Sequence, residues 1–204
     1  MRNITHEETY NGFTLSHTMH NSQGFYLEIL QDIEELMGHM TQKHGKVFFA
    51  MFGLKYPANT AAQYPDDNTL MSRFIGALKL HYKRLPCDAK CLWVRESSLA
   101  TGQFHYHILI LLDGNRTQSA HGLLSYATEE WRRCLEIVDA SGLVHLNRSG
   151  CNDDPYGGVM IIRDTPDFQQ VYGRCFERAS YLAKAYSKGI SPAHVNGFGR
   201  SQLH

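Results

Sequence analysis

The chain has 204 residues, of which 43% are hydrophobic and 20% charged, and its formal net charge is zero. This length suits one domain with a sizeable core. No run approaches the roughly 18 uninterrupted apolar residues that a membrane span needs, and the polar N-terminus lacks the features of a secretory signal. We therefore expect a cytoplasmic protein with no membrane partner. The five cysteines include no CxxC pair, which favours buried reduced thiols over a disulfide framework or a zinc knuckle.

The N-terminal half predicts two helices on either side of one strand. Residues 1–22 show no periodic apolar pattern and are expected to be an irregular lead-in. Apolar residues at helical spacing predict an acidic amphipathic helix over residues 25–40, packed on the domain from outside. The apolar run 47–54 predicts a central strand that ends before Pro57. A basic helix follows over residues 70–85, with Leu85 on its buried stripe.

The second half predicts a hairpin followed by further alternation of helix and strand. The apolar runs 91–96 and 104–112 are expected to pair about a turn at Ala100 and Thr101. A helix is predicted over residues 123–138, with Val138 on its buried side. The remaining predicted elements are a strand at either 143–146 or 159–162, a helix from about 165 to 188, and a loose tail over residues 189–204.

This order of elements predicts the fold class. A single domain over residues 23–188 is expected to be α+β, with a ferredoxin-like or RRM-like antiparallel sheet (β-α-β-β-α-β). One helix is added at its N-terminus and one at its C-terminus. The helices are expected on one face of the sheet, which leaves the other face free for a ligand. The sequence contains no phosphate-binding loop of the kind used by ATPases, so we expect no nucleotide cofactor.

Three residues of the predicted hairpin form a candidate metal site. Side chains alternate between the two faces of a strand, so His105 and His107 project to the same side. A hairpin that pairs Glu96 with His105 adds a carboxylate to that face. Two imidazoles and one carboxylate suit a divalent metal, Mg²⁺ or Mn²⁺, with positions left for a substrate. A His-x-His pair alone is more often structural, and the carboxylate strengthens the metal interpretation.

The last predicted helix carries a tyrosine among cations. At about 100° per residue, Tyr181 shares one face with Arg174, Arg178, Lys184 and Lys188, and the apolar residues lie on the opposite face. A surface aromatic on a solvated helix would give the same pattern. Beside a metal site, however, a phenol among cations can attack a phosphodiester.

These motifs resemble those of a known family. His105-Tyr106-His107 resembles the His-hydrophobic-His motif of the HUH endonucleases, and Tyr181-Leu182-Ala183-Lys184 resembles their YxxK nucleophile motif. With residues 93–96 and 54–57, the resemblance is closest to the replication-initiator family of inoviruses and related prophages. Some HUH initiators use two tyrosines, but Tyr186 stands at i+5 from Tyr181 and is turned about 140° away, so Tyr181 is expected to act alone.

The resemblance implies a function and a set of partners. Such proteins nick one DNA strand at an origin, stay attached to the 5′ phosphate through tyrosine, and leave a 3′ hydroxyl for rolling-circle replication. The implied partners are single-stranded or hairpin DNA at the origin and a separate helicase. The implied roles are Tyr181 and Lys184 in catalysis, Glu96, His105 and His107 at the metal, and Arg174, Arg178 and Lys188 in DNA binding.

Three other functions are compatible with the same residues. A transposase or a mobilisation relaxase would use the same chemistry on a different DNA. A nucleic-acid-binding regulator would keep the fold and not cut. The two histidines and the glutamate also match the ligand set of non-haem iron oxygenases, although the predicted sheet order and the tyrosine helix argue against that class.

Overall fold

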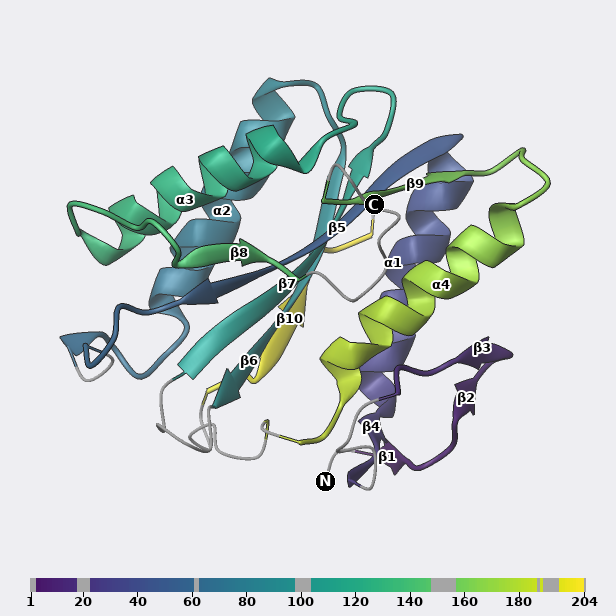
Figure 1. The fold of residues 1–204 in the computed structure, drawn as a ribbon, viewed down its shortest axis with the longest axis horizontal. Helices are drawn as coiled ribbons and strands as arrows, with labels where there is room; N and C mark the ends of the chain where they lie inside the picture. The colour runs from purple at the N-terminus through teal and green to yellow at the C-terminus, as the bar shows by residue number, and fades with distance from the viewer. Residues whose placement is uncertain are drawn as a thin grey trace.

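The computed structural model describes residues 3–17, 23–60, 63–97, 104–147, 157–186, 188 and 195–203. At its centre is a six-stranded sheet with the order β10-β6-β7-β5-β8, in which β9 also pairs with β5 (Figure 1). Every pairing in this sheet is antiparallel. Its strands are β5 (Lys46–Lys55), β6 (Ala89–Ser97), β7 (Phe104–Asp113), β8 (Val144–Leu146), β9 (Val159–Ile162) and β10 (Phe198–Arg200).

Four α-helices pack on this sheet, two on each face (Figure 1). They are α1 (Leu27–Lys43), α2 (Thr69–Arg84), α3 (Ala120–Leu135) and α4 (Phe168–Ser180), and α4 continues into a short 3₁₀ helix, η3 (Tyr181–Ala183). One core joins α1 and α4 to the sheet, and a second core joins α2 and α3 to its other face. The prediction of helices on one face only, with a free face for a ligand, is therefore wrong.

The apolar pattern of β5 explains why both faces are covered. The strand carries eight consecutive buried residues between its exposed ends. Phe49 and Met51 belong to the core under α1 and α4, while Phe48 and Phe52 belong to the core under α2 and α3. A strand that is apolar on both sides needs a layer on each side. Helix α1 supplies one of these layers and is part of the core, and does not pack from outside as the sequence predicted.

The two apolar runs between α3 and α4 are both strands. Strand β8 pairs with Phe52–Leu54 and β9 pairs with Lys46–Phe49, so they follow one another along the same edge of β5. Helix α3 ends earlier than predicted, because Glu136 adopts a left-handed conformation (φ 56°). Val138, expected to be buried, is consequently 96% exposed, and Leu85 beyond α2 is 52% exposed.

The two terminal segments are more regular than predicted. In the lead-in, β1 (Ile4–Thr5) pairs with β4 (Phe25–Tyr26), and β2 (Thr9–Tyr10) forms a hairpin with β3 (Phe13–Thr14). The turn of that hairpin holds Asn11 and Gly12 at positive φ, as a tight two-residue turn requires. In the tail, β10 extends the sheet beside β6, so the expectation of a loose segment does not hold for Phe198–Arg200.

No helix in the described part of the chain is both long enough and apolar enough to cross a membrane.

Candidate metal centre and nucleophile

The hairpin of β6 and β7 brings the three predicted metal ligands together. Glu96 pairs with His105, and His107 lies two residues further on the same face, so the predicted register is confirmed. The Oε2 atom of Glu96 lies 3.6 Å from His105 Nε2 and 3.5 Å from His107 Nε2. Ligand atoms of all three residues lie within 4.8 Å of one another and can hold a metal ion. The turn expected at Ala100 and Thr101 lies outside the described residues.

The carboxylate of this cluster is buried and ionised. Glu96 is 2% exposed and His107 is 8% exposed. Burial alone would raise the pKa of Glu96, but hydrogen bonds from His105 and His107 and the charge of Lys188 outweigh it and hold the pKa below its usual range. Burial lowers the pKa of His107, which favours the neutral imidazole that a metal requires. The donor set therefore fits a divalent metal chemically.

Two lysines also reach this carboxylate, which the sequence did not predict. Lys188 Nζ lies 2.8 Å from Glu96 Oε1, and Lys184 Nζ lies 3.6 Å from Glu96 Oε2. Both lysines are buried, so neither lies on the exposed basic stripe expected from helical geometry. Burial lowers the pKa of Lys188 to about 8, against the opposing effect of Glu96.

The reason for this difference is the end of α4. The regular helix stops at Ser180, the next turn is 3₁₀, and Lys184 has extended backbone (φ −52°, ψ 134°). Lys184 then forms an isolated β-bridge with Phe25. The angle of 100° per residue no longer applies beyond Ser180, and the chain turns its lysines inward toward Glu96.

The predicted nucleophile lies beside the cluster. The Tyr181 ring is half-buried and meets the His107 ring edge to face, with 5.8 Å between ring centroids. Lys184 Nζ lies 3.5 Å from the Tyr181 ring centroid, a cation–π contact. Tyr181 and Lys184 are thus in contact with one another and next to the candidate metal ligands. Tyr186, the other tyrosine of this segment, is also half-buried.

Asn147 is a site residue that the sequence analysis missed. Its Nδ2 lies 2.8 Å from His107 Nδ1. Its backbone N–H donates to Met51, and its carbonyl accepts from Arg178, so the residue is held at both ends. When the amide donates to Nδ1, a neutral His107 carries its proton on Nε2; when Nε2 binds a metal, Nδ1 carries the proton and donates to the amide oxygen. Asn147 can serve His107 in both states.

A cavity of about 420 Å³ opens beside His107 and Tyr181. Arg178, His145 and Asn147 contribute polar groups to its wall, whereas Arg174 is exposed and does not line it. The close approach of His145 depends on a glycine opposite it, because a Cβ on Gly53 would lie 2.6 Å from the His145 ring. The cavity adjoins a candidate metal centre and a phenol, and it provides cationic and amide groups for a ligand.

Local sequence did not predict that Lys184 and Lys188 would contact Glu96. It did predict that Glu96, His105 and His107 would lie together. His105 and His107 are two apart on one strand, and Glu96 lies across one hairpin. Asn147 directly follows the apolar run 143–146, which was a candidate strand. Its position as the polar residue at the end of that strand was the feature of the sequence that could have identified it.

Comparisons with known proteins give the family. No solved structure matches the chain. The uncharacterized protein YagK of Escherichia coli (strain K12) is 26% identical over 223 aligned residues, which cover 96% of this chain and 99% of YagK. The uncharacterized protein YfjJ of the same organism is 26% identical over 158 residues, covering 67% of this chain and 72% of YfjJ. The model of the YagK/YfjJ C-terminal domain matches residues 5–201, so the chain belongs to the YagK/YfjJ C-terminal domain family.

Proposed function

We propose that this protein is a metal-dependent enzyme that nicks and rejoins single-stranded DNA through a 5′-phosphotyrosine, as an HUH-type initiator of rolling-circle replication. The observation that carries the proposal is the contact of the Tyr181 ring with both His107 and Lys184, next to a buried cluster of two histidines and one glutamate. A nucleophile, a cation and a metal-binding set within reach of one phosphate are what such a reaction needs.

Glu96, His105 and His107 would hold the metal, either Mg²⁺ or Mn²⁺. When bound, a divalent ion supplies Lewis-acid polarisation of a phosphate oxygen and orients that phosphate. The protein contributes a carboxylate kept ionised by its neighbours and an imidazole kept neutral by burial. Asn147 orients His107 through Nδ1.

Tyr181 would attack the phosphorus of the scissile phosphodiester. A bond forms from the phenol oxygen to phosphorus and the bond from phosphorus to the 3′ oxygen breaks. The proton that the phenol loses is balanced by the proton that the released 3′ hydroxyl gains. Lys184, over the Tyr181 ring, would stabilise the negative charge that develops on the phosphate. The reverse reaction rejoins the strand.

The proposal includes a ferredoxin-like core. The first four strands of the sheet along the chain are β5, β6, β7 and β8, and their order in the sheet is β6-β7-β5-β8. Helix α2 connects β5 to β6 and α3 connects β7 to β8, and both helices lie on the same face. This order supports a split βαβ arrangement. Helices α1 and α4 are then additions on the opposite face, and α4 brings Tyr181 to the metal ligands. Arg178, in the wall of the adjoining cavity, and Arg174, exposed on α4, would contact the DNA.

A covalent adduct tests the proposal directly. The protein is incubated with single-stranded DNA from the region flanking its gene and with Mn²⁺, and the products are separated on a denaturing gel. We expect a DNA–protein adduct that forms with Mn²⁺ and not with EDTA. An adduct that forms equally in EDTA would remove the metal from the mechanism, and the lack of any adduct across the flanking DNA on both strands would refute the proposed reaction.

A further inference from the structure

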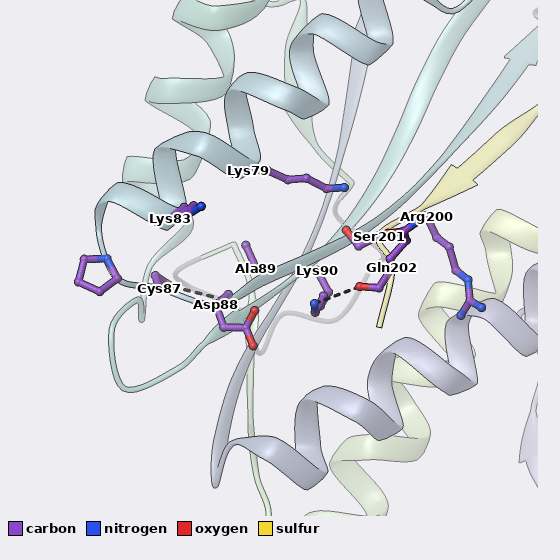
Figure 2. A pocket seen from close by; sticks show the side chains of 10 residues that line it. Lys79, Lys83, Cys87, Asp88, Ala89, Lys90, Arg200, Ser201 and Gln202 are labelled. Carbon is purple, nitrogen blue, oxygen red and sulfur yellow. Dashed lines mark hydrogen bonds between the residues drawn. The ribbon is translucent and has the colours of Figure 1, made fainter. Parts of the chain in front are cut away.

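A second polar site lies at the other end of β6 from Glu96. A hollow of about 640 Å³ is bordered by the end of α2, the start of β6 and the end of β10 (Figure 2). Lys79 and Lys83 line it from α2, Lys90 from β6 and Arg200 from β10. Among the described residues that line the hollow, Asp88 is the only carboxylate.

The charges in this hollow do not cancel. Asp88 is already paired with Lys43 at 2.7 Å and His44 at 3.1 Å; burial opposes ionisation, but these partners bring the pKa of Asp88 to about 2. Arg200 is paired with Asp32 at 2.9 Å and Glu35 at 2.6 Å on α1. In the part of the chain that the structure describes, no carboxylate lies within ion-pair distance of Lys79, Lys83 or Lys90. The charge of Lys90 also acts on Asp88 from a longer distance, so this single carboxylate faces Lys43, His44 and Lys90 together and the hollow keeps an excess of positive charge.

Ordinary helix energetics explain only part of this arrangement. Lys83 lies in the last turn of α2, where the helix dipole favours a cation. Lys79 is one turn earlier on the same face, where a second positive charge at i−4 is unfavourable without an anion. Lys90 comes from a different element, and its Nζ donates to the carbonyl of Gln202 at 3.1 Å across the hollow's floor (Figure 2). Three lysines from two elements converge on one hollow, with Lys79 and Lys83 exposed to solvent, and form a positive surface suited to an anionic partner.

We propose that this hollow binds the phosphodiester backbone of the DNA on which the Tyr181 site acts, an inference that rests on the proposed function. Ammonium groups bind phosphates as point charges and do not read base edges. No aromatic side chain is among the described residues lining the hollow, so bases have no surface for stacking there. The contacts are therefore electrostatic and independent of base sequence.

The distance between the two sites sets the length of DNA that touches both. Lys90 and Glu96 are six residues apart on β6, and strand geometry separates them by about 20 Å. Duplex DNA advances about 3.4 Å per base pair along each strand, so about six base pairs span this distance. Strand β10 covers the outer edge of β6 at Leu92–Val94, and helices cover both faces of β6, so the DNA passes over the β10 edge of the sheet. A hairpin stem longer than about six base pairs that extends from the nick past β10 reaches the hollow. A single strand of three nucleotides held at the Tyr181 site does not.

The salt dependence of binding tests this inference. The probes are a fluorescent hairpin with a stem of about twelve base pairs and a single-stranded trinucleotide, which is too short to span both sites, titrated by anisotropy at several salt concentrations. The variants are Lys83→Gln, the triple variant Lys79→Gln/Lys83→Gln/Lys90→Gln, and the control Arg133→Gln. Arg133 is exposed on α3 and pairs with Glu129 on its own helix, outside the hollow.

Each lost phosphate contact reduces the magnitude of the slope of log K against log salt by about 0.9. With the hairpin we expect a reduction of about 0.9 for Lys83→Gln and about 2 to 3 for the triple variant. We expect no change with the trinucleotide, and none for Arg133→Gln. Circular dichroism of each variant checks that the fold is retained. If the slope of log K against log salt for the hairpin equals that of the wild type in both lysine variants, the inference is overturned.

Two outcomes separate this inference from its alternatives. Loss of binding to phosphatidylserine vesicles in the triple variant, with hairpin slopes unchanged, would assign the hollow to a membrane surface and overturn the inference. The binding experiment does not depend on cleavage. A wild-type protein that forms no adduct refutes the proposed reaction, yet a reduced hairpin slope in the lysine variants would still establish the backbone contact.

Discussion

Lys188 Nζ lies 2.8 Å from Glu96 Oε1, although the two residues are 92 positions apart in sequence. The same ammonium donates to the carbonyl of Lys184 at 2.8 Å, so its position is set by two acceptors. Lys188 is 4% exposed and Glu96 is 2% exposed. A carboxylate suited to a divalent cation therefore already has a monovalent one as its partner, and the two cations compete for it.

This competition predicts that Lys188→Met binds Mn²⁺ more tightly than the wild type. Removing an opposing ion pair worth about 1.4 kcal/mol would increase affinity about tenfold. Isothermal titration calorimetry measures the dissociation constant. The control is Lys46→Met, which removes an exposed lysine from the start of β5. Unchanged or weaker Mn²⁺ binding in Lys188→Met would show that Lys188 supports the metal site and does not compete with it.

The three ligands are expected to differ in how strongly they bind the metal. His105→Ala and His107→Ala each remove one imidazole from the cluster and should abolish measurable Mn²⁺ binding. Glu96→Gln keeps an oxygen that can coordinate, so its loss should be smaller. Titration calorimetry of the purified variants gives the order, with His121→Ala, exposed on α3, as a matched control. Retained binding in both histidine variants would place the metal elsewhere.

Tyr181 is predicted to be the nucleophile, and Tyr186 is not. Tyr181→Phe should abolish the covalent DNA adduct and leave DNA affinity within about twofold of the wild type, because the ring and Lys184 stay in place. Tyr186→Phe should still form the adduct. Peptide mass spectrometry of the adduct identifies the modified residue. A DNA-linked peptide carrying the modification on Tyr186 would reverse this assignment.

Asn147 is predicted to act on the metal through His107. Asn147→Leu removes the partner of Nδ1 and should weaken Mn²⁺ binding by about 10- to 100-fold. Asn147→Asp, which can still accept from Nδ1, should recover most of that affinity. The ¹⁵N chemical shifts of His107 report which ring nitrogen carries the proton, a readout that a general loss of stability does not change. Equal affinities in Asn147→Leu and Asn147→Asp would count against this role.

The ion pairs of Asp88 predict how stability depends on pH. Its pKa in the folded protein is about 2 and its ordinary value is 3.8, so the folded state binds the proton less well than the unfolded state. The corresponding stability is fully present above pH 4 and is lost as the pH falls toward 2. Urea unfolding at pH 5, 4 and 3 should show a smaller loss in Asp88→Asn than in the wild type. Asp164→Asn, exposed near β9, serves as the control.

Local sequence was sufficient to predict that Glu96, His105 and His107 lie together and to predict most strands of the central sheet. Alternation along β7 places His105 and His107 on one face, and one hairpin adds Glu96, so only backbone geometry and a short-range register were needed. The order of strands and helices was likewise visible as changes in apolar periodicity between residues 46 and 162. The sequence also identified Tyr181 and Lys184 as neighbours, because they are three residues apart.

Tertiary structure decided where the cations point and how the sheet is covered. Helical periodicity placed Lys184 and Lys188 in solvent, but α4 stops at Ser180 without a glycine or proline to mark the end. Its continuation is instead set by the β-bridge of Lys184 to Phe25 and by the attraction of both ammonium groups to Glu96. Such contacts join residues that are about 90 or more positions apart. Periodicity reports only the local backbone, whereas these positions depend on which distant apolar faces and buried charges meet when the chain packs.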